Sequence, residues 1–215
     1  MTDSELWSVV WLTLRVTCTA LLLSALLGIP LGTWLGLARF RGKALVTALV
    51  HTGMGLPPVV VGLAFYLLLS RSGTFGPLGW LFTPQAMILA QAVIAFPLVT
   101  GITMTAVAAV PAELFVQVRS LGASRAQANW AVLREARAGV LVALAAGFGR
   151  IISEVGAALM VGGNIRGHTQ VLTTAIVQQT SQGEFALALA LAGWLLGLTL
   201  AANVFILSLQ GKPQG

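Results

Sequence analysis

The sequence predicts an all-α membrane protein, a polytopic helix bundle that forms a single transmembrane domain over residues 1–215. Hydrophobic residues make up 57% of the chain and charged residues 8%, and the mean hydropathy is +0.92. A soluble domain of this length cannot bury so much apolar surface, so the lipid bilayer has to be the main solvent. The apolar residues also come in long runs, which favours helices over strands.

The long apolar runs predict five spanning helices. A hydrocarbon core ~30 Å thick needs roughly 20 helical residues, and each run is at least that long. The expected spans cover residues of about 6–38, 44–70, 83–109, 138–161 and 184–209. Because five is an odd number, the two termini are expected on opposite sides of the membrane.

The basic residues are distributed unequally between the two sides of these spans. One side holds Arg39, Arg41, Lys43, Arg119, Arg125, Arg134, Arg137 and Lys212, and the other holds Arg71 and Arg166. The positive-inside rule therefore predicts an external N-terminus and a cytoplasmic C-terminus. The formal charge of +6 is spread thinly between apolar runs, so we do not expect a nucleic-acid partner.

The first span follows Asp3 and Glu5 rather than a basic segment, and it is too long for a cleavable signal peptide. We expect it to be retained as a helix. It also exceeds what a bilayer needs, so its outer turns should project. Arg15 is then expected to extend toward the outer lipid headgroups, and a role in a transport pathway is the alternative.

The second span contains "HTGMGLPPVVVG", which puts His51, three glycines and Pro57-Pro58 at membrane depth. Proline removes a backbone donor and kinks a helix. A kinked helix lined by glycine suits packing around a pathway, but close packing between helices would explain the same residues.

The segment 111–137, between the third and fourth spans, predicts a helix, a tight turn and a second helix. Pro111 fits the first turn of a helix that runs to Leu121, and Gly122 then breaks it. Ser124 and Gln127 have the spacing of a capping box, which starts the next helix.

The second helix of this segment should begin at Arg125 and carry Ala126, Trp130 and Leu133 on one face. An amphipathic helix lying on anionic lipid would explain the arginines and the tryptophan. The tight turn favours another interpretation, because a helix on a lipid surface gains nothing from it, whereas a projection that fits a protein groove does.

The stretch "RSLGASRAQANWAVLREARAGVL" resembles the cytoplasmic coupling motif of ABC importer permeases. Gly122 corresponds to the glycine of that motif, and Ala123-Ser124 to the residues after it. The resemblance implies contact with an ATPase subunit through Arg119, Ser120, Leu121, Gly122, Ala123, Ser124, Arg125 and Gln127.

The same stretch departs from the general motif at two places. Val116-Gln117-Val118 stands in place of an acidic-Ala-Ala triplet, and Glu135 in place of a proline. The resulting "VLREAR" is similar to the tungstate-type branch of the molybdate, sulfate and tungstate permeases. Two further stretches, at 148–176 ("FGRIISEVGAALMVGGNIRGHTQVLTTAI") and 180–191 ("TSQGEFALALAL"), are similar to these oxyanion permeases too.

The resemblance implies a fold like that of type I ABC importer permeases, located in the cell (inner) membrane. It implies a homodimer that works with two cytoplasmic ATPase subunits and an external oxyanion-binding protein, with no cofactor of its own. Tungstate is the substrate it favours, and molybdate or sulfate are the alternatives. A self-contained secondary carrier is a further alternative, but five helices without an internal repeat are few for one.

The fourth span contains two opposite charges, Arg150 and Glu154, four residues apart on one expected helical face and close enough to pair. Charges at membrane depth are costly and mark functional sites by default. The pair is either a switch whose partners differ between transport states or a neutral pair that only joins helices.

Just outside this span, "VGGNIRG" contains Gly162, Gly163, Asn164 and Arg166. Backbone amides in a glycine-rich turn, together with one arginine, could hold an oxyanion transiently. A plain external loop is the alternative.

Catalytic chemistry of any kind is not expected. The sequence has no phosphate-binding loop of the Gly-x-x-x-x-Gly-Lys-Ser/Thr type. His51 and His168 are far apart, and Cys18 is the one cysteine, so neither a catalytic set nor a metal site is suggested. The chain is therefore expected to be a non-enzymatic subunit that depends on ATP hydrolysis elsewhere.

Overall fold

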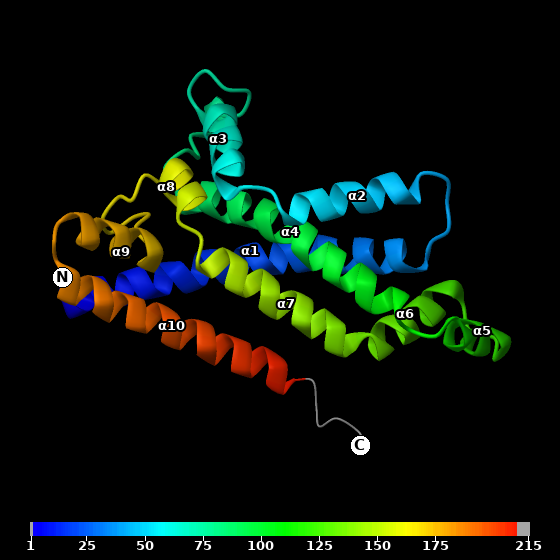
Figure 1. Cartoon of the computed structure of the whole chain (residues 1–215). Helices are drawn as coiled ribbons and strands as arrows, with labels where there is room; N and C mark the ends of the chain where they lie inside the picture. Colours follow the sequence, from blue (N-terminus) through cyan, green and yellow to red (C-terminus); the bar gives the residue numbers. More distant parts are fainter. Residues whose placement is uncertain (1, 210–215) are drawn as a thin grey trace.

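The computed structural model describes residues 2–209, and all the regular structure within them is helical (Figure 1). This confirms the predicted all-α class. Lys212, which contributed to the predicted orientation, lies outside the described residues. The helices are α1 (Asp3–Leu37), α2 (Lys43–Met54), α3 (Pro58–Leu69), the 3-10 turn η1 (Gly76–Leu78), α4 (Pro84–Ala108), α5 (Ala112–Ser120), α6 (Arg125–Glu135), α7 (Arg137–Ile152), α8 (Gly156–Gly162), α9 (Leu172–Ser181) and α10 (Phe185–Ser208).

Three helices, α1, α4 and α10, are each long and apolar enough to cross a membrane, close to where the sequence predicts spans. The other two expected spans are not continuous helices. The α2–α3 pair is bent by 94° and the α7–α8 pair by 59°. Counting each bent pair as one span gives up to five. The span expected over 44–70 contains the bend at its prolines, and the one expected over 138–161 contains a bend that the sequence did not indicate.

Each break has a local physical cause. Between α2 and α3, Pro57 and Pro58 lack backbone donors and disfavour a helical conformation in the residue before them. Between α7 and α8, the Glu154 carboxylate, one residue before the N-cap Val155, accepts a hydrogen bond from the backbone N–H of Ala157 at 3.0 Å and so satisfies a first-turn donor of the new helix. The proline kink was foreseen in the sequence, but the second break had no such marker.

The most extensive contact among the described helices joins α1 and α4, which run side by side (Figure 1). Three glycines at intervals of four residues, Gly28, Gly32 and Gly36, form the contact surface of α1. A Cβ atom at Gly32 would lie 2.5 Å from the carbonyl oxygen of Thr100. Small residues at this spacing allow two membrane helices to approach closely enough for backbone-level packing.

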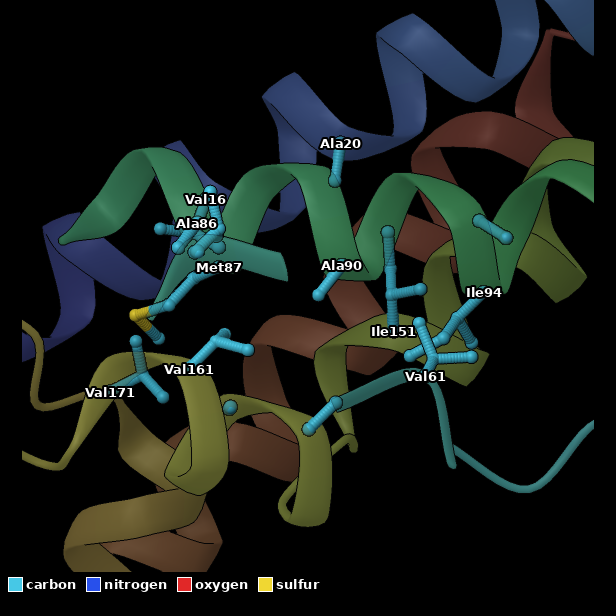
Figure 2. Close-up of a cluster of buried hydrophobic side chains, with 14 residues drawn as sticks. Val16, Ala20, Val61, Ala86, Met87, Ala90, Ile94, Ile151, Val161 and Val171 are labelled. Carbon is cyan, nitrogen blue, oxygen red and sulfur yellow. The ribbon is translucent and has the colours of Figure 1, made fainter. Parts of the chain in front are cut away.

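The main core connects both bent pairs to this α1–α4 unit (Figure 2). Val16 of α1 and Met87 of α4 pack in one cluster with Val61 of α3, Ile151 of α7 and Val161 of α8. Five helices thus contribute to a single buried cluster, and the positions of the two breaks are fixed by it.

A second cluster covers the first turns of α1. Val9 and Val10 are buried against Leu172 of α9 and Leu191 of α10. Thr13 supports the contact, because its hydroxyl accepts a hydrogen bond from the backbone N–H of Leu172 at 2.9 Å. One side of these turns is therefore packed against protein rather than exposed to lipid or water.

Two glycine substitutions, one inside the α1–α4 contact and one outside it, should differ in their effect on stability. Gly32→Ala should lower the thermal unfolding midpoint in detergent, because the added Cβ meets the Thr100 carbonyl and overpacking costs about 1–3 kcal/mol. Gly197→Ala on α10 is the matched control, since nothing lies within 4 Å of its Cβ position, and it should be neutral or stabilising by up to about 1 kcal/mol. Equal effects of the two substitutions would contradict the packing described here.

Candidate functional site

The predicted helix–turn–helix segment is present as α5 and α6 at the end of the bundle remote from the N-terminus (Figure 1). Pro111 immediately precedes α5 instead of lying in its first turn. Gly122 forms the turn with a φ of +88°, and nothing lies within 4 Å of its Cβ position. The Arg119 guanidinium donates a hydrogen bond to the Ala123 carbonyl across the turn.

The predicted capping box at the start of α6 is confirmed. The Ser124 hydroxyl accepts from the backbone N–H of Gln127 at 3.2 Å, and the Gln127 side-chain oxygen accepts from the backbone N–H of Ser124 at 2.7 Å. This reciprocal pair fixes the direction in which α6 leaves the turn.

The buried face of α6 is not the one that carries Ala126, Trp130 and Leu133. Ala128 and Val132 are buried, whereas Ala126 and Trp130 are exposed and Leu133 lies at the edge of the core. The reason is tertiary, because α6 folds back onto the end of α4 and packs with Val107 there. The face that carries Ala126, Trp130 and Leu133 is therefore mostly exposed, and α6 packs on the protein through another face.

The turn consequently carries an exposed apolar surface. Leu121 is 88% exposed, Trp130 65% and Val116 64%, and exposed Arg119 and Arg125 flank them. Leu121 lies at the turn itself, and Val116 and Trp130 lie in the two helices that flank it. Of the eight residues predicted to contact a partner, seven are exposed and Ala123 is half-buried.

Arg150 and Glu154 do not form the predicted ion pair. Helix α7 ends at Ile152, so the two residues do not share a continuous helical face. Glu154 is 8% exposed in the break and caps α8, while Arg150 is exposed. Within residues 2–209, the salt bridge that the structure contains joins Arg166 and Glu5. The prediction fails because the break redirects the chain between the two charges.

The two helix breaks lie against each other. A Cβ atom at Gly156 would be 2.8 Å from Val59 Cγ2, and one at Gly62 would be 2.8 Å from the Cα atom of Ala157. Helices α3 and α8 are therefore in contact at glycine positions immediately beyond both bends. Any change of angle at one break has to be accommodated at the other.

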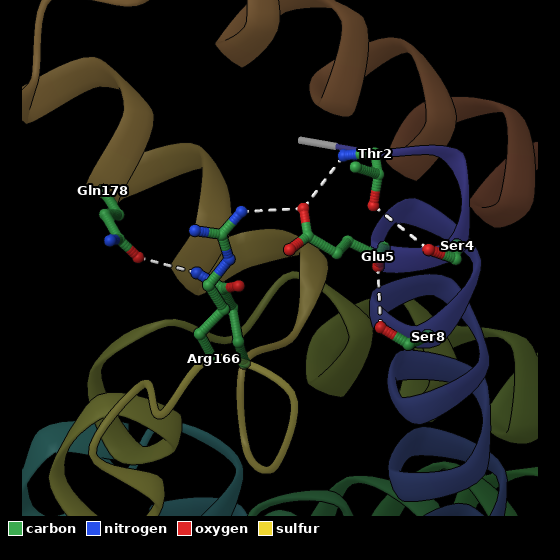
Figure 3. Close-up of polar contacts among 7 residues, drawn as sticks. Thr2, Ser4, Glu5, Ser8, Arg166 and Gln178 are labelled. Atoms are coloured by element: carbon green, nitrogen blue, oxygen red, sulfur yellow. Dashed lines mark hydrogen bonds and ion pairs between the residues drawn. The ribbon is translucent and has the colours of Figure 1, made fainter.

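The glycine-rich turn after α8 holds its polar residues in contacts with other elements (Figure 3). Gly163 and Asn164 adopt positive φ values of 71° and 51°. The Asn164 amide donates to the Gln178 side chain at 2.9 Å, and the Arg166 guanidinium pairs with the Glu5 carboxylate at 2.7 Å. Both residues connect the turn to α9 and α1, and the predicted role of this turn toward an oxyanion stays a prediction.

Sequence reasoning missed Glu5 and Gln178 as partners of this turn. Arg166 and Glu5 are 161 residues apart in the sequence, and no motif connects them. A Glu in the first turn of a helix is ordinary, because it complements the helix dipole. The contact is visible only once the turn after α8 has been placed beside the start of α1.

Comparison with known proteins adds independent information. Residues 28–209 match the family described as "Binding-protein-dependent transport system inner membrane component". A probable anion ABC transporter permease of Haloferax volcanii is 43% identical over 97% of this chain and 92% of its own length. A tungstate uptake system permease of Peptoclostridium acidaminophilum is 39% identical, over 97% and 91%. A molybdenum transport system permease of Escherichia coli is 34% identical, over 86% and 84%.

Among solved structures, the MetNI methionine ABC transporter in an inward-facing conformation contains a chain of the same fold. The TM-score is 0.76, with 99% of this chain and 100% of that chain covered. The sequences are 22% identical, so this likeness concerns the fold alone.

The separation of Arg150 from Glu154 generates a second prediction. In a double-mutant cycle of Arg150→Met and Glu154→Leu, the two effects on the free energy of unfolding should add within about 0.5 kcal/mol. Glu154→Leu alone should cost about 1–3 kcal/mol, because it leaves the Ala157 N–H without its acceptor. Equilibrium unfolding in mixed micelles measures the single and double variants. A coupling energy above about 1 kcal/mol would show that Arg150 and Glu154 interact directly.

Proposed function

We propose, from the premise that the chain belongs to the family of binding-protein-dependent transport system inner membrane components, that it is the tungstate-conducting permease of an ATP-driven importer. Two copies of the chain would form the pathway. Two cytoplasmic ATPase subunits would supply the energy, and an external oxyanion-binding protein would deliver the ion. In this proposal the chain is not itself catalytic.

The substrate assignment is carried by one observation. The tungstate permease relative is more similar to this chain, and over more of its length, than the molybdenum permease relative described above. Tungstate, molybdate and sulfate are all tetrahedral dianions, so charge alone does not separate them. The motifs "VLREAR" and "TSQGEF" support the same choice, and the external protein is expected to discriminate more than the permease does.

The broken helices support conduction rather than tight binding. Helix breaks at membrane depth are typical of substrate pathways. Here the N-terminus of α8 is already occupied by the Glu154 carboxylate, which would repel a dianion. A pathway has to release the ion as readily as it accepts it, and this arrangement favours release.

The α5–α6 turn is the proposed contact with the ATPase. Its apolar tip at Leu121 and its flanking arginines offer a surface that fits into a groove of a partner protein. Gly122 extends this surface, since its Cβ position is open. The proposed orientation, with an external N-terminus, places this turn on the cytoplasmic side where the ATPases are.

Replacing Gly122 with Trp should abolish the stimulation of ATPase activity by the loaded binding protein while leaving membrane insertion intact. The bulky side chain would fill the space that the partner needs. Gly42→Trp is the matched control, because Gly42 also has a positive φ and nothing within 4 Å of its Cβ position, so the backbone strain is the same. Loss of stimulation in both variants, or in neither, would contradict the proposed contact.

The orientation is tested by cysteine labelling of intact cells. In a Cys18→Ser background, a cysteine at Ser72 or Gln182 should react with an impermeant maleimide applied outside the cell, and one at Ser120 should not. The opposite labelling pattern would remove the turn from the cytoplasmic side and refute the coupling role.

The substrate is tested by uptake. A deletion strain complemented with this chain and its partners should accumulate tungsten from nanomolar tungstate, measured by elemental mass spectrometry. A tenfold excess of molybdate should compete weakly, and sulfate less. Preferential restoration of molybdenum would refute tungstate while leaving the importer architecture intact, and uptake independent of ATP would refute the architecture itself.

A further inference from the structure

A polar hollow of about 390 Å³ opens beside the N-terminal half of α1. Three segments that are distant in the sequence form it: the α1 turns around Ser8–Arg15, the first turn of α4 at Gln85, and the loop at 167–170 that follows the glycine-rich turn. None of the sequence motifs predicted this meeting of segments.

The polar lining of this hollow is suited to an anion. Arg15, Gln85 and His168 line it, and among residues 2–209 no side-chain hydrogen-bond partner is found for any of the three. Gln170, which is 6% exposed, contributes a buried amide that is held in place by its bond to Gln178. The lining includes no carboxylate, and Arg15, Gln85 and His168 can each donate to an anion.

The rest of the hollow is apolar and aromatic. Val9, Trp11 and Leu12 form this wall. Trp11 is 69% exposed, and the neighbouring Trp7, which is 60% exposed, packs edge-on against Trp194. Tryptophans exposed in this way on membrane proteins gather at the level of the lipid headgroups. A small inorganic anion would gain no binding energy from these apolar and aromatic side chains, whereas a lipid would.

The depth of the hollow agrees with a headgroup position. Helix α4 has 25 residues, which is about 37 Å of helix, so its first turn lies near one surface of a hydrocarbon core ~30 Å thick. Val16, next to Arg15, packs in the same cluster as Ala86 and Met87 in that first turn. Arg15 is therefore within reach of the lipid phosphates on that side.

From this geometry we propose that the hollow binds the phosphate of a phospholipid from the leaflet nearest the N-terminus. The Arg15 guanidinium donates to the phosphate oxygens in a forked arrangement, and Gln85 and His168 donate from the other sides. Trp11 lies along the glycerol and upper acyl region. The lipid would then join α1, α4 and the loop at 167–170, a role distinct from the transport of a free oxyanion.

Trp11 provides the optical readout for a test. The purified full chain in detergent is titrated with phosphatidylglycerol brominated on its acyl chains, which quenches nearby tryptophan. Quenching should contain a saturable component that Trp11→Phe removes. Arg15→Gln should weaken the apparent affinity of that component about tenfold or more, as expected for the loss of a charge-assisted hydrogen bond.

Two variants and a competitor complete the test. Arg71→Gln, which removes an exposed cation outside the hollow, should leave the affinity unchanged. His168→Ala should also weaken the apparent affinity for the lipid. This variant tests the hollow even if Arg15→Gln fails to fold. Equal affinity in the Arg15→Gln or His168→Ala variants, or a saturable component that survives Trp11→Phe, would overturn the proposal. Release of the quenching by millimolar tungstate would overturn it as well, by assigning the hollow to a free oxyanion.

Discussion

The close contact between α1 and α4 is the interaction on which the rest of the molecule depends. Water does not drive membrane helices together, so their association relies on close packing. Gly28, Gly32 and Gly36 permit it by removing side chains from the contact. The resulting pair forms a rigid frame against which both bent helix pairs pack.

The chain also supplies hydrogen-bond partners for the backbone groups at one of its helix breaks. A break in a membrane helix leaves backbone groups without partners, and lipid offers none. At the α7–α8 break the protein supplies them: Glu154 accepts from Ala157, and the Glu154 carbonyl accepts from Thr173. Because these groups are satisfied internally, the bend can be stable in the membrane and still be a place where the chain changes direction.

The sequence predicted whatever depended on composition or on local chemistry. The three long helices follow from apolar length, and the Ser124 capping box follows from a short-range spacing. The parts it missed depend on distant partners. The buried face of α6 depends on its contact with Val107 of α4. Arg150 and Glu154 are separated by a helix break that no proline marks. No periodicity within either helix contains that information.

The packing of the first turns of α1 also bears on how the chain is made. Val9, Val10 and Thr13 leave the ribosome well before Leu172 and Leu191, against which they pack. Contacts of such high sequence separation form slowly. The buried face of the first turns of α1 is therefore completed only after α9 and α10 have been synthesised, and until then that face is uncovered in the membrane.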